Sequence, residues 1–113
     1  KGIILLEDGN EFDQARLKSI LESQGQVYLQ EFIALDRPRD IRAFVVDGAV
    51  LGAIYRVAPP GQWISNLARG GQPAVCPVTK KLQDLAGRAA EAVGAVYCGV
   101  DLLETDGGLT VIE

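Results

Sequence analysis

The chain has 113 residues, of which 48% are hydrophobic, a formal net charge of −4 and no histidine. This length allows one domain with a single core at most. An acidic chain without a run of Lys or Arg lacks the charge pattern of a nucleic-acid-binding protein. Without histidine, and with Cys76 and Cys98 far from any CxxC spacing, Ser-His-Asp catalysis and a zinc site are excluded within this segment, and both thiols are expected to be reduced.

The apolar segments give no sign of a leader or of a membrane span. Asp47 and Gly48 interrupt the longest apolar candidate, and no basic stretch precedes an apolar one near Lys1. We therefore expect a soluble, cytoplasmic domain without a membrane partner. Strand-like sequence reaches both ends of the chain, so we expect residues 1–113 to be a single domain cut from a larger module.

The first third of the chain predicts a strand, a helix and a second strand. Gly2–Glu7 and Val27–Phe32 have the composition of buried strands. Between them, Asn10 is a suitable N-cap for a helix over Glu11–Gln24, and Gly25 is typical of a helix end. We expect the apolar residues of this helix to share one face: Phe12, Leu17, Ile20 and Leu21.

The middle and last thirds predict two hairpins and a second helix. Asp40–Asp47 and Ala49–Val57 read as strands joined by a tight turn at Asp47-Gly48, and a patternless loop of about twenty residues follows over 58–77. Thr79 caps a helix that ends near Val93 and has an apolar stripe. The order of elements predicts an α+β fold, with an antiparallel sheet and helices on one face.

The last fifteen residues predict a hairpin with a carboxylate on each strand at its open end. Residues 102–105 and 109–112 are strand-like, and Asp106-Gly107-Gly108 forms the turn, so Asp101 and Glu113 are expected to lie near each other. Oxygen ligands favour Mg²⁺ or Mn²⁺ over zinc. The alternative is that Asp101 ends a strand and Glu113 binds nothing.

Further polar residues interrupt the strands and the long loop. Gln30 and Glu31 lie where a strand passes into a loop, from which backbone groups can bond a planar base. Asp40 and Arg42 are two residues apart on a strand and therefore share a face. The remaining members of this set are suited to binding a polyphosphate or a carboxylate, because guanidinium is a planar donor and glycine exposes backbone amides. They are Arg56, Asn66, Arg69, Gly70 and Gly71. The alternative is a surface ion pair between Asp40 and Arg42, solvating arginines and an ordinary turn.

Six short motifs along the chain, taken in series, resemble the RimK-type ATP-grasp ligases. They are Gln30-Glu31-Phe32-Ile33, Asp40-Ile41-Arg42, Tyr55-Arg56, Asn66-Leu67-Ala68-Arg69-Gly70-Gly71, Gly99-Val100-Asp101 and Val111-Ile112-Glu113. The resemblance implies the second half of the module that clamps ATP. The stretch from Trp63 to Gln72 looks most like LysX-type enzymes, which attach an amino acid to the C-terminal glutamate of a small carrier protein in amino-acid biosynthesis.

The resemblance also implies roles for individual residues. It makes Asp101 and Glu113 two of three Mg²⁺ ligands, and it places Arg56 and Arg69 in catalysis near the phosphates and the acceptor. The implied nucleotide contacts are Gln30, Glu31, Phe32 and Ile33 as the adenine hinge, with Asp40, Arg42, Arg56 and Asn66. The phosphate-binding lysine and the third metal ligand, an Asn two residues past the Glu, would lie outside this chain, so we expect the fragment alone to be inactive.

The implied activity is ligation of a carboxylate to an amine at the expense of ATP. The carboxylate attacks the γ-phosphate, and an amine captures the acyl phosphate. The implied cofactors are ATP and Mg²⁺ or Mn²⁺, and the implied partners are an amino acid and a glutamate-terminated peptide or carrier protein. A homo-oligomer is left open. The alternative is a non-catalytic nucleotide- or metal-binding or oligomerisation module, which could dispense with Asp101 and Glu113.

Overall fold

The computed structural model describes residues 3–113. The chain forms two compact units, one ending at Ile33 and one running from Ala34 to Glu113, and each is described by itself. The expectation of a single domain that is part of a larger module stays a prediction.

The first unit contains one helix, α1 (Glu11–Gln24), with the ends that the sequence predicts. The Asn10 side chain accepts hydrogen bonds from the backbone N–H groups of Phe12 and Asp13, and Gly25 ends the helix at φ 75°. The expected apolar face is not buried within this unit, where Phe12 is 88% exposed.

The two strands predicted in the first unit are wrong as far as residues 3–33 are described; Gly2 lies outside the described residues. Residues 3–7 and 27–32 are extended or irregular and form no strand. A strand needs the hydrogen bonds of a neighbouring strand, and within residues 3–33 no segment provides them. Apolar composition alone therefore misled the prediction.

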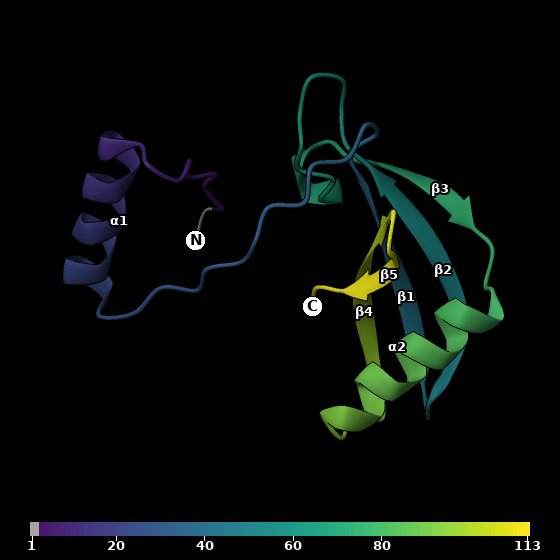
Figure 1. Ribbon diagram of the computed structural model, residues 1–113. Helices are drawn as coiled ribbons and strands as arrows, with labels where there is room; N and C mark the ends of the chain where they lie inside the picture. Colours follow the sequence, from purple (N-terminus) through teal and green to yellow (C-terminus); the bar gives the residue numbers. More distant parts are fainter. Residues whose placement is uncertain (1–2) are drawn as a thin grey trace. The chain divides into compact units, whose positions relative to one another are not determined.

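The second unit is a five-stranded antiparallel sheet with a helix on one face (Figure 1). The order across the sheet is β3-β2-β1-β4-β5. The strands are β1 (Arg39–Val46), β2 (Ala49–Val57), β3 (Gln72–Cys76), β4 (Tyr97–Thr105) and β5 (Gly108–Val111). This architecture confirms the predicted α+β fold class.

The hairpin of β1 and β2 begins at a two-residue turn, and its register shifts by one residue between Phe44 and Val45 before it reaches the site. Its turn has positive φ at both central residues, Asp47 at 49° and Gly48 at 75°, which is the geometry that favours a two-residue hairpin. Asp47 and Gly48 thus join Val46 directly to its partner Ala49.

Helix α2 (Lys80–Ala92) covers one face of the sheet and encloses the core. Thr79 caps it by accepting from the Leu82 N–H at 3.2 Å, and Gly94 follows its end, as predicted. Alternate residues of β1 and β4 point into this core, so the residues between them lie on the opposite face, which α2 does not cover and which is called the open face below. The buried hydrophobic residues of the core are Ile41, Ala43, Val45, Cys76, Leu82, Ala86, Ala90, Val100 and Leu102.

Strand β3 lies within the segment 58–77 that the sequence predicted to be a loop. Pro73 falls inside this strand, opposite Arg56, and prolines are tolerated there because β3 is at the edge of the sheet. A proline and the lack of alternation concealed the strand. Within residues 3–113, no helix is both long and apolar enough to cross a bilayer.

Candidate active site

The polar side chains of the open face meet because of the strand register. Asp40 on β1 pairs with Arg56 on β2, and Arg42 on β1 pairs with Asp101 on β4. Directly opposed residues of antiparallel strands have their side chains in contact on one face. Asp40 and Arg42 therefore each find a partner of opposite charge on a different neighbouring strand, and the predicted alternative of an Asp40–Arg42 surface pair is wrong.

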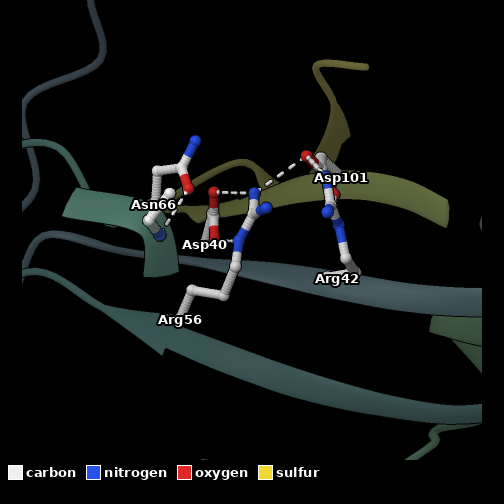
Figure 2. A network of polar contacts seen from close by, with 6 residues as sticks. Asp40, Arg42, Arg56, Asn66 and Asp101 are labelled. Carbon is white, nitrogen blue, oxygen red and sulfur yellow. Dashed lines mark hydrogen bonds and ion pairs between the residues drawn. The ribbon is translucent and has the colours of Figure 1, made fainter. Parts of the chain in front are cut away.

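Arg56 is held in a buried fork between two carboxylates (Figure 2). Its Nε donates to Asp40 Oδ1 at 2.7 Å, and its Nη2 donates to Asp40 Oδ2 and, at 2.8 Å, to Asp101 Oδ2. Asp40, Arg56 and Asp101 are 7%, 6% and 3% exposed. Charges this deeply buried persist only when they are paired and hydrogen-bonded, so the three residues depend on one another.

Arg42 also binds Asp101, and it is the more exposed of the two arginines. Its Nε and Nη2 donate to Asp101 Oδ1 at 2.8 Å and to Asp101 Oδ2 at 2.7 Å. The hydrogen bond with Asp101 raises the pKa of Arg42, and the bond with Asp40 raises the pKa of Arg56, so both stay cationic. The Arg42 side chain is 38% exposed, which makes it the accessible member of a network that contains two positive and two negative groups.

A β-bulge brings Glu113 opposite Asp101. The Asp101 N–H donates to the Glu113 carbonyl at 2.7 Å, and the Asp101 carbonyl accepts from the N–H groups of Ile112 and Glu113 at 2.8 and 3.4 Å. Two residues of one strand thus face one residue of the other, which defines a bulge and redirects side chains. In a regular ladder, the Leu102–Val111 register would put Ile112 opposite Asp101 and Glu113 on the other face.

Asp101 and Glu113 have the donor chemistry of a magnesium site, and their role as metal ligands stays a prediction. They supply the oxygen ligands that Mg²⁺ prefers, and the bulge places their backbones side by side. Among residues 3–113, no group of three or more acidic, cysteine or histidine side chains is arranged to hold a metal ion. Mg²⁺ is usually bound through one or two carboxylates, with water and phosphate oxygens filling the remaining positions, so two protein ligands are a sufficient donor set.

The loop before β3 is shaped by Asn66 and two glycines. Asn66 Oδ1 accepts from the Ala68 N–H at 3.0 Å and caps the short 3-10 helix Leu67–Arg69, which Gly70 ends at φ 91°. A Cβ on Gly71 would lie 2.0 Å from the Ser65 carbonyl oxygen, so no larger residue fits there. Arg69 is exposed on this turn, and no ion pair joins it to the Arg–Asp network.

The predicted adenine hinge belongs to the other unit. Gln30, Glu31, Phe32 and Ile33 form an extended segment at the end of the first unit, without strand pairing. Their role as nucleotide contacts stays a prediction. Asp40 was predicted to contact the nucleotide. In this structure both of its carboxylate oxygens accept hydrogen bonds from Arg56, which is the geometry of a residue that positions an arginine.

A second polar cluster, which no sequence motif predicted, lies on the face that carries α2. Arg39 pairs with Glu104 at 2.7 Å and stacks over the Tyr55 ring at 4.0 Å, while the Tyr55 hydroxyl donates to Glu104 at 3.3 Å. Burial, then a hydrogen bond with Cys76, raises the pKa of Tyr55 to about 12. No motif signals this cluster, because it depends on the register of three strands.

Comparisons with known proteins agree on one family. The family described as the RimK-like ATP-grasp domain matches residues 2–113. A tetrahydromethanopterin:alpha-L-glutamate ligase of Methanosarcina acetivorans is 47% identical over 78% of this chain and 27% of its own length. A probable alpha-L-glutamate ligase of Hahella chejuensis is 37% identical over 99% of this chain and 37% of its own length.

A solved structure resembles the chain as well. The ATP-grasp ligase PsnB, in complex with a phosphomimetic variant of its minimal precursor, Mg and ADP, matches with a TM-score of 0.53 and 26% identity, over 71% of this chain and 23% of PsnB. The chain thus spans only about a quarter to somewhat more than a third of the proteins that it matches.

Proposed function

Because the chain belongs to the RimK-like ATP-grasp family, we propose that it is part of an ATP- and Mg²⁺-dependent ligase that joins a carboxylate to an amine. The names of the relatives support a ligase that uses an amino acid, and the PsnB complex with Mg and ADP supports the cofactors.

The observation that carries the proposal is the Arg–Asp network next to Glu113 on the open face of the sheet. Phosphoryl transfer is catalysed mainly by positioning and by stabilising charge on the transferred group. Asp101 and Glu113 would hold Mg²⁺, which balances the charge of the phosphate oxygens when bound. Asp40 fixes Arg56 through two hydrogen bonds. Arg42 is partly exposed and carries a guanidinium of the shape that binds carboxylate or phosphate, with its Nε and Nη2 bonded to Asp101 in this structure.

The remaining assignments follow the same proposal. Gln30 to Ile33 would contact the adenine, Asn66 would lie near the phosphates, and Arg69 would lie near the acceptor. Glutamate is the first amino acid to test because the relatives are named glutamate ligases. A peptide or carrier protein is the first acceptor to test because PsnB was solved with a precursor peptide. The LysX-like subtype, the role in amino-acid biosynthesis and the cytoplasmic location stay predictions.

The test is ADP formation by the full-length protein that carries this chain, measured with ATP, Mg²⁺, glutamate and candidate peptide acceptors. We expect Asp101→Asn to lower turnover by about a hundredfold or more, the loss typical of removing one electrostatic contact to the reacting group. The circular dichroism spectrum should remain that of the wild type. Asp106→Asn is the matched control, because Asp106 lies exposed in the turn of the same hairpin, and it should keep wild-type turnover.

Two results would contradict the ligase proposal. Turnover retained by Asp101→Asn would remove the metal assignment. Nucleotide binding by the wild-type protein without ADP formation, for any amino acid and acceptor tried, would favour the alternative of a non-catalytic nucleotide-binding module.

A further inference from the structure

Asp101 is the point where two requirements of the site conflict. Its Oδ1 accepts from Arg42, and its Oδ2 accepts from both Arg42 and Arg56. These bonds take three of the roughly four lone-pair positions of the carboxylate, and the one left, on Oδ1, lies beside the Arg42 guanidinium. A divalent cation at that position would be repelled by the guanidinium. Arg42 and a metal ion therefore compete for Asp101.

The contacts of the two arginines show which one can leave. Arg56 makes two further hydrogen bonds to Asp40, and its side chain is 7% exposed. Arg42 has Asp101 as its only ion-pair partner among residues 3–113, and its side chain is 38% exposed. If Arg42 turns outward, its guanidinium exchanges a carboxylate for water. If Arg56 turned outward, Asp40 would remain buried as a charge without a partner. The second loss is the larger one.

We propose that Arg42 is the exchangeable counter-ion of Asp101: a divalent cation that binds Asp101 and Glu113 displaces the Arg42 guanidinium into solvent. The inference rests on the proposed function, which makes Asp101 a metal ligand. It adds that the planar donor of Arg42 becomes available to an anionic substrate group only after the metal is bound. Metal and anion binding are then coupled through one side chain.

The first measurement is a Mn²⁺ titration of the full-length protein, followed by electron paramagnetic resonance, which counts free Mn²⁺. Arg42→Gln removes the guanidinium that competes with the metal for Asp101. It should therefore tighten Mn²⁺ binding by about tenfold, which corresponds to about 1.4 kcal/mol. Arg39→Gln is the matched control. Arg39 lies on the same strand, is 39% exposed and pairs with Glu104 at 2.7 Å, but on the other face of the sheet. It should leave the Mn²⁺ affinity unchanged.

A second measurement makes its main comparison on the wild-type protein, with and without Mn²⁺. Phenylglyoxal modifies accessible guanidinium groups, and peptide mass spectrometry can follow each arginine separately. We expect Mn²⁺ to accelerate modification of Arg42 several-fold and to leave Arg56 protected. Asp101→Asn should expose Arg42 to the reagent without Mn²⁺, because the charged partner is gone.

The outcomes separate the inference from the proposed function. Mn²⁺ binding that is absent, or that Asp101→Asn does not weaken, overturns the metal assignment and the inference with it. Mn²⁺ binding that depends on Asp101 but is not tightened in Arg42→Gln, or that slows the modification of Arg42, overturns the inference alone. Tighter binding in Arg42→Gln together with faster modification of Arg42 in the wild type establishes the exchange.

Discussion

The buried half of the network allows a quantitative test of what holds the site together. Asp40→Ala would remove two of the three hydrogen bonds of Arg56 and leave that buried guanidinium with Asp101 alone. Removing one partner of a buried ion pair costs about 3–5 kcal/mol, because the remaining charge is buried without compensation. Domains of this size are typically stable by about 5–15 kcal/mol, so the loss is a large part of the total.

Urea unfolding of the full-length protein, followed by circular dichroism, measures this loss. The matched control is Glu104→Ala. The Arg39–Glu104 pair also joins a guanidinium to a carboxylate, but its side chains are 39% and 43% exposed. An exposed pair contributes at most about 1 kcal/mol. The double variant Asp40→Leu with Arg56→Met replaces both charges by apolar groups and should be more stable than Asp40→Ala. If Asp40→Ala costs no more than Glu104→Ala, the reasoning about buried charge is refuted.

Three further predictions concern the core, the loop and the tyrosine. Leu82→Ala should lower the free energy of unfolding by about 2–5 kcal/mol in urea denaturation, because Leu82 is 1% exposed; a loss below 1 kcal/mol would contradict this packing. Gly71→Ala should cost about 1–3 kcal/mol because the new Cβ meets the Ser65 carbonyl, and wild-type stability would contradict the loop geometry. The pKa of Tyr55 is raised from 10.0 to about 12, so its contribution to stability is complete below pH 10 and is lost as pH rises through 12. The difference in phenolate absorbance between wild type and Tyr55→Phe should show ionisation near pH 12, and ionisation near pH 10 would be inconsistent with the partial burial of Tyr55 and its polar contacts.

Local signals predicted the elements whose ends depend on local chemistry. Asn10 and Thr79 cap the two helices, and Asp47-Gly48 makes the hairpin turn, because each acts through its own side chain or backbone freedom. Whether a segment becomes a strand depends on pairing with residues distant in the sequence. Strand β3 pairs with β2, whereas residues 3–7 and 27–32 form no strand, and local composition indicated neither outcome.

The site was predictable as a set of residues and not as a network. Asp40, Arg42, Arg56 and Asp101 were all identified, and the register of three strands decided which of them pair. The bulge at Glu113 has no signature in the sequence. It is set by which backbone groups bond Asp101 and could only be found in the structure.

The most direct test of the ligase assignment is calorimetric titration of the full-length protein with a non-hydrolysable ATP analogue, with and without Mg²⁺, alongside Asp101→Asn. We predict binding that Mg²⁺ strengthens and that Asp101→Asn weakens only when Mg²⁺ is present. Binding that is absent, or that responds to neither Mg²⁺ nor Asp101, would contradict the assignment of Asp101 and Glu113 to a metal–nucleotide site.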